Sequence, residues 1–317
     1  MTMNDSPERR GKVSFVVNPE SRAGATRKRW PGIREMAEKR LGPIESYLTT
    51  APGDATEITR RCLDRGASLV VCVGGDGTLN EVVNGFMQED GSVRERVLLG
   101  YIPVGTGCDF ARSVSIPRDP EGALDVITRG RTRLIDLGRL TYTDGRGQRV
   151  VRYFDNAVSF GMGGAVVARV RDYARFCGPY TAYFFSLLSS IFLEGKKQLR
   201  LQVDGHPEAS FRAWHVVTAN GRFQGHALEV APDASIDDGL LDVLVFGDIG
   251  FIDVFRHLPK LYSGRTETIK EVTRTRGRKI SASSEEAVLV EADGELIGRL
   301  PVEIDIIPGV LRMITGP

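Results

Sequence analysis

The sequence predicts two fold classes in succession, an α/β domain built on a parallel sheet and then a mainly antiparallel β-sandwich domain. Strand and helix patterns alternate from Val13 to Pro103, which is typical of a parallel sheet with helices on both faces. From Arg133 onward strand patterns predominate, and the turn signals Asp144-Gly145 and Asp204-Gly205 stand between strands as in β-hairpins. A chain of 317 residues is long enough for both domains.

Apolar runs and amphipathic segments place the elements of the first half. We expect strands at 13–17, 46–50, 69–73 and 97–103, and helices at 27–41, 56–64 and 78–88. Ligands of such sheets bind beyond the carboxyl ends of the strands. Three loops lie there: Asn18–Gly24, the turn that begins at Gly74, and Pro103–Asp109.

The same patterns place strands and helices in the second half. We expect strands at 134–142, 149–158, 197–203, 211–219 and 240–246, and helices at 164–175, 180–193 and 251–262. We therefore assign the domains to residues 11–138 and 139–310, with the C-terminal tail as a candidate for rejoining the first domain. No low-complexity linker separates the halves, so we expect them to pack together with a small-molecule site between them.

The composition is that of an ordinary globular protein and excludes several classes. With 42 basic and 41 acidic residues the net charge is +1, so no global field favours nucleic acid. The four cysteines lack CxxC or Cys/His spacing, and we interpret them as reduced thiols. Residues 1–10 are polar and resemble neither a signal peptide nor an anchor. The longest apolar stretch, 180–193, is shorter than the roughly 20 residues that cross a bilayer, so we expect a cytoplasmic protein.

The turn Gly74–Glu81 (GGDGTLNE) has the features of a phosphate cradle. It follows the apolar strand 69–73 and opens an amphipathic helix. Glycines at such a turn let backbone N–H groups approach an anion at a helix N-terminus. A P-loop is excluded because no lysine lies between Lys39 and Lys196. Glycines needed only for turn geometry are the alternative, but the carboxylate of Asp76 favours a metal or an acid–base step.

Three aspartates at the ends of predicted elements suggest a magnesium site. Asp76 lies in the glycine-rich turn, Asp109 in the third loop and Asp136 at the domain junction. Each alone also fits a helix cap or an Asx turn. Carboxylates beside a phosphate cradle are typical Mg²⁺ ligands, so together they indicate a nucleotide–Mg²⁺ site and phosphoryl transfer.

Two turns of the second half also carry acidic residues. Ala231–Leu240 resembles a cation-binding loop of closely spaced oxygen ligands but lacks the EF-hand spacing, and a plain surface turn is the alternative. Asp293-Gly294-Glu295 follows the apolar run 287–290 and, by sequence alone, predicts a hairpin turn.

In order along almost the whole chain, the motifs resemble the diacylglycerol kinase catalytic-domain family in its soluble bacterial lipid-kinase branch, which is similar to sphingosine and ceramide kinases. The resemblance rests on Asn18-Pro19, Gly53-Asp54-Ala55, Gly74–Gly85, Pro103–Arg112, Asp136-x-Gly138, Asn156-x-x-x-x-Gly161, Ala231-Pro232, Asp238-Gly239-Leu240 and Asp293-Gly294-Glu295. It implies an α/β nucleotide-binding domain and a β-sandwich lipid-substrate domain, with ATP and Mg²⁺ in the cleft. The implied activity is transfer of the γ-phosphate to a lipid hydroxyl, with diacylglycerol, giving phosphatidate, as the preferred candidate.

The resemblance also implies roles for individual residues. Asp76, Asp109 and Asp136 would hold the catalytic Mg²⁺ through water, and Asp76 therefore counts as catalytic. Asp293 is favoured as the general base, and Glu295 is kept open. Asp238, with the carbonyls of Ser235 and Leu240, would hold a structural Mg²⁺. Nucleotide binding would involve Asn18, Thr49, Gly74, Gly75, Asp76, Gly77, Thr78, Leu79, Asn80 and Thr106.

One position departs from the family pattern. Cys108 stands where asparagine is usual, and a thiol cannot donate an amide hydrogen bond, so a contact that braces the loop or binds phosphate is in question. The stretch 169–197 mixes cations with aromatic residues and leucines, which predicts a wall for acyl chains and contact with anionic headgroups, or else a core helix. We therefore expect a lipid partner, peripheral membrane association and no nucleic acid, and we leave a homodimer open.

Other functions stay open on the sequence alone. The acceptor could be a sphingoid base, ceramide or phosphatidylglycerol. An NAD-type kinase of a soluble alcohol shares the GGDGT turn, although the match beyond Asp136 favours a lipid. A non-catalytic regulator that binds a nucleotide or a lipid is the third possibility. The presence of Asp76, Asp109 and Asp293 argues against it.

Overall fold

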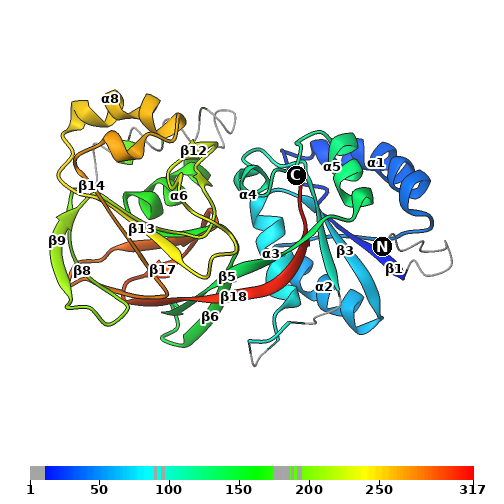
Figure 1. The fold of residues 1–317 in the computed structure, drawn as a ribbon, viewed down its shortest axis with the longest axis horizontal. Coiled ribbons are helices and arrows are strands. Elements are labelled where there is room, and N and C mark those ends of the chain that lie inside the picture. The colour runs from blue at the N-terminus through cyan, green and yellow to red at the C-terminus, as the bar shows by residue number, and fades with distance from the viewer. Residues whose placement is uncertain are drawn as a thin grey trace, which may run out of the picture. The chain divides into compact units, whose positions relative to one another are not determined.

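The computed structural model describes residues 11–88, 91–93, 97–173, 181, 186, 189–190 and 195–317. Two compact units divide the chain: one runs to Ile135 and takes up again at Val310–Pro317, and the other is Asp136–Gly309. Strands β5 (Thr132–Thr143) and β18 (Val302–Ile314) each pass from one unit to the other (Figure 1).

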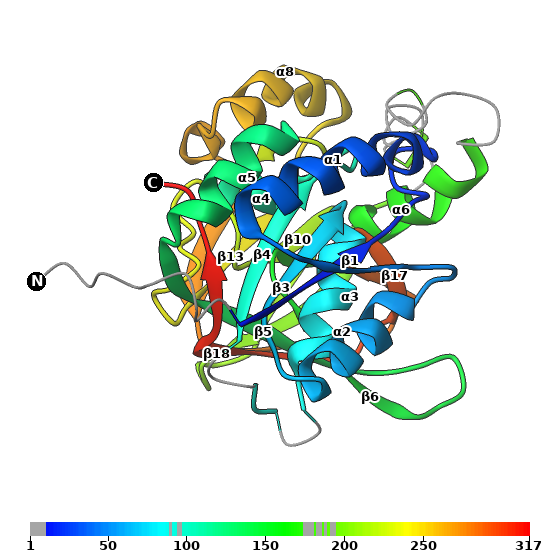
Figure 2. The same ribbon diagram turned by 90° about the vertical axis from the view of Figure 1, so that its right-hand side faces the viewer.

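The first unit is the predicted parallel sheet with helices on both faces. Its elements are β1 Lys12–Val17, α1 Ala25–Leu41, β2 Glu45–Leu48, α2 Asp54–Asp64, β3 Ala67–Gly74, α3 Asp76–Phe86, β4 Leu98–Pro103, α4 Asp109–Ser113 and α5 Pro120–Arg129. The strand order is β2-β1-β3-β4, all parallel, and β18 joins β4 in parallel through Met313 and Leu99. Helices α1 and α5 cover one face of the sheet, and α2 and α3 cover the other (Figure 2). The α/β prediction is confirmed.

Local sequence explains most of these elements. Strands β1 and β3 are near-continuous apolar runs and are almost wholly buried, as expected when helices cover both faces. Helix α5, which the sequence analysis did not predict, has Asp119 as its N-cap. The Asp119 carboxylate accepts the Gly122 N–H at 2.7 Å, and Pro120 occupies the first helical position.

The second unit is an antiparallel β-sandwich, and this prediction is also confirmed. Its further elements are β6 Arg149–Phe154, β7 Ala157–Gly161, α6 Met162–Tyr173, β8 Lys197–Val203, β9 Ala209–Ala213, β10 His215–Ala219, β11 Phe223–Gln224, β12 Leu228–Glu229, β13 Leu241–Phe246, α8 Phe251–Tyr262, the 3₁₀ turn η2 Thr266–Thr268, β14 Val272–Gly277, β15 Lys279–Ser283, β16 Leu289–Ala292 and β17 Glu295–Arg299. One sheet has the order β6-β5-β18-β15-β8-β9, and the other β14-β13-β10-β7-β16-β17. Apolar side chains from both sheets form one core, which includes the fully buried Phe154 and Phe160.

Two predicted strands are wrong because each is a pair of strands in different sheets. The predicted strand 149–158 divides at Asp155-Asn156 into β6 and β7, and the predicted strand 211–219 divides at Trp214 into β9 and β10. An apolar pattern continues through such a crossing, so periodicity alone does not reveal it. The predicted helices outside 180–193 begin within about two residues of the observed ones. Most of 180–193 lies outside the described residues.

None of the helices in the described part of the chain is long and apolar enough to span a membrane.

The glycine of the Asp136-x-Gly138 motif is required by packing against a neighbouring strand. Gly138 on β5 faces Phe154 on β6, and a Cβ at Gly138 would lie 1.9 Å from the Phe154 ring. We predict that Gly138→Ala lowers the free energy of unfolding by about 1–3 kcal/mol or more, because Phe154 is fully buried and has little room to move. Chemical denaturation measures this. Gly145→Ala is the control, since nothing lies within 4 Å of a Cβ there, and equal stability losses in both variants would contradict the prediction.

Candidate functional site

The glycine-rich turn begins where β3 ends and α3 starts. Gly75 has extended backbone angles and precedes Asp76, the first residue of α3, and the Leu79 N–H donates to the Gly75 carbonyl at 3.0 Å. A Cβ at Gly74 would lie 2.5 Å from the Thr78 side chain. The first glycine is therefore needed for close packing rather than for a left-handed backbone conformation.

The third loop, Pro103–Asp109, packs directly on this turn. The Gly74 carbonyl accepts the N–H groups of Val104 (2.9 Å) and Gly105 (3.1 Å). A Cβ at Gly105 would lie only 2.3 Å from the Gly75 Cα. Any side chain at Gly105 would thus force the two loops apart. The glycines of both motifs are therefore required for the same reason, the close approach of the two backbones.

The two loops bring Asp76 and Asp109 together around Gly107. A Cβ at Gly107 would lie 3.0 Å from Asp76 Oδ2 and 3.8 Å from Asp109 Oδ2. Asp76 Oδ1 accepts the N–H of Phe110 at 3.3 Å, and Asp109 is buried beside Arg112, whose Nε lies 3.9 Å from Asp109 Oδ1. Two carboxylates therefore lie beside the N-termini of α3 and α4.

Other predicted nucleotide residues also lie at the carboxyl ends of the strands in this unit. Asn18 follows β1, and its Nδ2 donates to Thr78 Oγ1 at 2.9 Å. Thr49 follows β2 and donates its N–H to the Val17 carbonyl at 2.9 Å. Arg118 binds the carbonyls of the third loop, including that of Thr106 at 2.7 Å. The arrangement leaves the first, second and third loops side by side along one edge of the sheet.

Glu81, the last residue of the GGDGTLNE motif, has a structural role that the sequence analysis missed. Its carboxylate accepts the N–H groups of Gly53 (2.8 Å) and Ala55 (3.0 Å) at the start of α2. These contacts join α3 to the Gly53-Asp54-Ala55 motif and satisfy two N–H groups that have no partner within α2.

Cys108, the departure from the family pattern, is wholly buried and occupies a left-handed backbone position (φ 51°, ψ 48°). Asparagine tolerates this region better than most residues, which gives a backbone reason for its usual presence. Burial raises the pKa of the Cys108 thiol to about 11, and the charge of Asp76 adds to the effect, while the Tyr101 side chain hydrogen-bonds the sulfur. Cys108 is therefore a neutral, buried thiol that lies close to Gly105 of the same loop.

Asp136, the third predicted magnesium ligand, lies in the second unit. Its carboxylate accepts backbone N–H groups on both oxygens, from Gly239 at 2.7 Å and from Gly309 at 2.6 Å. Burial raises the pKa of Asp136, and these two hydrogen bonds oppose the rise. In this unit Asp136 thus fixes the loop after Asp238 against the middle of β18.

The loop Ala231–Leu240 is held by an arginine. Arg276 Nη2 has three oxygen neighbours: the Asp233 carbonyl (3.0 Å), Asp238 Oδ2 (3.0 Å) and Asp242 Oδ2 (2.9 Å). The other oxygen of Asp238 accepts the Leu240 N–H at 3.0 Å. A magnesium ion bound through Asp238 would therefore compete with the guanidinium of Arg276.

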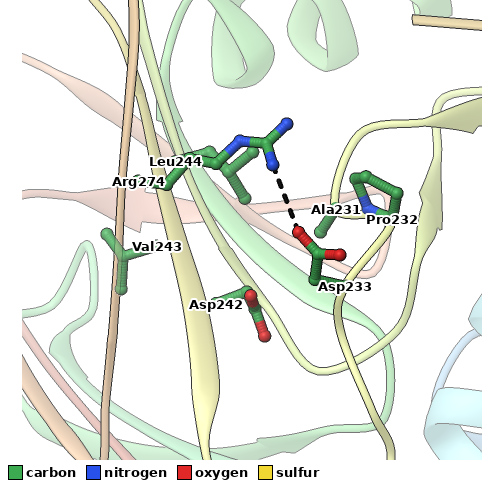
Figure 3. A pocket seen from close by; sticks show the side chains of 7 residues that line it. All are labelled: Ala231, Pro232, Asp233, Asp242, Val243, Leu244 and Arg274. Carbon is green, nitrogen blue, oxygen red and sulfur yellow. Dashed lines mark hydrogen bonds and ion pairs between the residues drawn. The ribbon is translucent and has the colours of Figure 1, made fainter. Parts of the chain in front are cut away.

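The adjacent hollow is lined by Ala231, Pro232, Asp233, Asp242, Val243, Leu244 and Arg274 (Figure 3). Arg274 Nη1 pairs with Asp233 Oδ2 at 3.2 Å, and both side chains line the hollow (Figure 3). With about 10 Å³ of room, it holds at most a single water molecule and is too small for a lipid or a nucleotide.

The turn that carries Asp293 joins β16 to β17 as a hairpin, as the sequence predicts. Asp293 is buried and has a positive φ of 47°. Its carboxylate accepts three successive backbone N–H groups, those of Asp155 (3.1 Å), Asn156 (3.2 Å) and Ala157 (2.9 Å). Burial raises the pKa of Asp293, and the hydrogen bonds from Ala157 and from Asp155 oppose the rise. A carboxylate with a raised pKa and a fixed position suits a proton acceptor.

Glu295, the alternative base, is held by an ion pair. Arg152 Nη2 lies 2.6 Å from Glu295 Oε2, and the Glu295 side chain is 42% exposed. The carboxylate of Glu295 is thus neutralised at the surface, whereas that of Asp293 is buried.

Glu291 is a buried acid that the sequence analysis missed. Only 2% of it is exposed, and its carboxylate accepts from Ser159 Oγ at 2.5 Å, from the Gln224 side chain, and from the Gly294 N–H at 2.9 Å. Burial raises the pKa of Glu291 to about 7. A single glutamate within the apolar run 287–292 was the available signal, because a charge in a buried strand needs partners.

Part of the predicted acyl-chain wall, including Tyr183, Phe184, Leu188 and Phe192, lies outside the described residues. Within the described part, Arg169 on α6 donates to Ser190 Oγ at 2.8 Å.

Two family models match this chain, one in each half. Residues 12–140 match the diacylglycerol kinase catalytic domain, and residues 156–315 match the YegS C-terminal NAD kinase beta sandwich-like domain. The chain belongs to the diacylglycerol kinase catalytic-domain family, and it carries the YegS-type C-terminal domain.

Individual relatives agree over nearly their full length. The chain is 27% identical over 305 residues to a diacylglycerol kinase of Mycobacterium tuberculosis (strain CDC 1551 / Oshkosh), covering 96% of this chain and 95% of the relative. It is 28% identical over 295 residues to a diacylglycerol kinase of Staphylococcus carnosus (strain TM300), covering 92% and 91%. A crystal structure of a Bacillus anthracis str. Sterne protein superimposes with a TM-score of 0.80 at 23% identity, covering 100% of this chain and 99% of the other. That likeness concerns the fold.

The donor chemistry of the first unit fits a catalytic magnesium ion. Asp76 and Asp109 offer hard carboxylate oxygens beside the glycine-rich turn, and Mg²⁺ usually takes one or two carboxylates together with waters and phosphate oxygens. Among the described residues no group of three or more His, Cys, Asp or Glu side chains is arranged to hold a metal ion. A magnesium ion that shares its coordination with a nucleotide does not need such a group.

Removal of the Arg276 side chain should make the Ala231–Leu240 loop dependent on a cation. We predict that wild-type protein melts at the same temperature with Mg²⁺ and with EDTA. Arg276→Met should lose about 1–2 kcal/mol, a few degrees in melting temperature, because three oxygens lose a charged donor. Added Mg²⁺ should recover part of that loss.

Thermal unfolding of each variant with and without Mg²⁺ measures this. Arg149→Met, which removes an exposed ion pair with Glu303, is the control. Destabilisation of the wild type by EDTA would contradict the role given to Arg276.

Proposed function

We propose that the protein is an ATP- and Mg²⁺-dependent lipid kinase that phosphorylates a lipid hydroxyl, with diacylglycerol as the preferred acceptor. That it is a lipid kinase rests on its membership of the diacylglycerol kinase family. Family membership does not by itself identify ATP as the nucleotide, Mg²⁺ as the metal or diacylglycerol as the acceptor. The single observation that supports them most is the close packing of two glycine-rich loops around Asp76 and Asp109.

The first unit would bind and orient the nucleotide. Gly74 and Gly75 let Thr78 and the third loop pack closely on the turn. Phosphate oxygens would bind at the N-terminus of α3 that follows, where the helix dipole favours negative charge. Asn18 and Thr78 hold the first and second loops together through their 2.9 Å hydrogen bond. Asp76 and Asp109 would hold the magnesium ion, which when bound neutralises charge on the transferring phosphoryl group.

The second unit would supply the proton acceptor. Asp293 is fixed by three backbone N–H groups, and burial raises its pKa, so its carboxylate suits removal of the proton from an attacking alcohol. Asp136 stays a proposed ligand of the magnesium ion through water, although both of its carboxylate oxygens accept N–H groups. A structural magnesium ion at Ser235, Asp238 and Leu240 is the alternative to the Arg276 contacts, and the comparison of Mg²⁺ with EDTA decides between them.

A kinase of a soluble alcohol is the competing function. The second domain matches a group described as NAD kinase beta sandwich-like. Labelled ATP with Mg²⁺ and a panel of diacylglycerol, sphingoid base, ceramide, phosphatidylglycerol and NAD separates the candidates, once the products are resolved by chromatography. Labelled phosphatidate as the main product supports the proposal, and labelled NADP without any lipid product contradicts it.

Loss of Asp76 should abolish phosphate transfer without unfolding the protein. We predict that Asp76→Ala lowers kcat at least about 100-fold, because charge on the transferring group loses a ligand to its counter-ion. The circular dichroism spectrum should stay that of the wild type. Asp64→Ala, at the exposed end of α2, is the control and should keep full activity. Wild-type rates in Asp76→Ala would overturn the assignment.

The two candidate bases can be separated by isosteric substitutions. Asp293→Asn should lower kcat by about 100-fold or more, since a general base contributes that much to proton transfer. Glu295→Gln should lower it less than about tenfold, because that carboxylate is paired with Arg152 at the surface. Steady-state rates at saturating ATP measure both. The reverse ranking would make Glu295 the base.

A further inference from the structure

Two adjacent residues of one short hairpin are tied to the Asp293 turn by separate hydrogen bonds. The hairpin consists of β11 and β12, paired through Phe223–Glu229 and Gln224–Leu228. Phe223 offers its carbonyl to Asn156 Nδ2 at 2.8 Å, and the Gln224 side chain donates to the Glu291 carboxylate.

Asn156 and Glu291, the partners of the hairpin, are each hydrogen-bonded to the turn that carries Asp293. The Asn156 backbone N–H donates to Asp293 Oδ1 at 3.2 Å. Glu291 Oε2 accepts the N–H of Gly294, the residue after Asp293, at 2.9 Å. The contacts therefore form a closed ring that runs from β11 through Asn156 to Asp293 and returns through Gly294 and Glu291.

The hairpin at one side of this ring has an unusual backbone. Gly225, His226 and Ala227 have successive positive φ values of 66°, 66° and 76°. Left-handed conformations cost non-glycine residues about 1–2 kcal/mol each, so the tip keeps this shape only if surrounding contacts hold it. The hydrogen bond from the side chain of Gln224 to Glu291 is such a contact, because Gln224 directly precedes the tip.

Asp293 also needs external support. It is itself a non-glycine residue at φ 47°, in a turn whose next residue, Gly294, is at φ 81°. Its own backbone N–H donates to the Ala157 carbonyl at 3.0 Å. Glu291 holds the other side of the turn, through Gly294, and is itself braced by Ser159 on β7.

We infer that Glu291 is a positioning residue: it couples the strained hairpin Phe223–Glu229 to the turn that presents Asp293 and so holds the Asp293 carboxylate in its reactive place. This inference rests on the proposed role of Asp293 as the proton acceptor. Glu291 itself contacts no reacting atom and acts only through the position of Asp293. Its effect is on the rate of transfer and not on nucleotide binding, whose residues lie in the first unit.

Three variants test the coupling. Glu291→Ala removes the acceptor shared by Ser159, Gln224 and Gly294, and we expect kcat to fall at least tenfold while KM for ATP stays within about twofold. Glu291→Gln should stay within about threefold of wild type, since the amide oxygen still accepts the Gly294 N–H. Gln224→Ala should lower kcat about threefold to tenfold, and Gln224→Ala combined with Glu291→Ala should be no slower than Glu291→Ala alone.

A second readout does not depend on activity. Hydrogen–deuterium exchange of the segment 291–299 should be faster in Glu291→Ala and also in Gln224→Ala, although Gln224 does not touch Gly294. Glu303→Gln, an exposed carboxylate of the same unit that pairs with Arg149, is the matched control for both readouts. If Glu291→Ala does not fold, Gln224→Ala and Glu291→Gln still decide the question.

The outcomes separate the inference from the proposed function. A wild-type protein that phosphorylates no lipid overturns the proposed function, and exchange in Gln224→Ala still decides whether the hairpin and the turn are coupled. Wild-type kcat in Glu291→Ala, losses that multiply in the double variant, or unchanged exchange in Gln224→Ala would each overturn the inference.

Discussion

Three successive backbone N–H groups, those of residues 155–157, donate to the Asp293 carboxylate where the chain crosses from one sheet of the sandwich to the other. A buried N–H without an acceptor costs about 1–3 kcal/mol. The crossing therefore depends on this carboxylate for its hydrogen bonding. The group proposed to accept the proton therefore also joins the end of β6 to the start of β7.

Carboxylates that accept backbone N–H groups recur throughout the chain. Asp136 accepts from Gly239 and Gly309, and Glu81 accepts from the start of α2. Asp204, in the turn after β8, accepts the N–H groups of Arg278 and Lys279. An acidic residue in a family motif is thus not by itself a metal ligand. Asp76 and Asp109 are better candidates, because their carboxylates flank a glycine-lined cradle beside two helix N-termini.

Close approach of backbones, rather than left-handed turns, explains the glycines of the proposed nucleotide site. Gly74, Gly75 and Gly105 lie outside the left-handed region, and each would place a Cβ against a neighbouring loop or side chain. In the second unit the guanidinium of Arg276 joins two oxygens of the Ala231–Leu240 loop to the carboxylate of Asp242 on β13. The acidic loops of the two units therefore differ, because in the second unit an arginine of the chain itself neutralises the carboxylates.

The sequence by itself determined the order of strands and helices from β1 to β4, the hairpin at Asp293 and the glycine-rich loops, because apolar periodicity and turn residues are local signals. It did not reveal that 149–158 and 211–219 each change sheets, since a buried apolar run looks the same on either side of the crossing. Nor did it reveal the partners of the acids. Glu291 with Gln224, Asp238 with Arg276 and Asp293 with residues 155–157 are pairs far apart in the chain. Only the tertiary structure brings them together. For Glu291 and Asp293 the physical reason is burial, because a buried charge needs a hydrogen-bond partner.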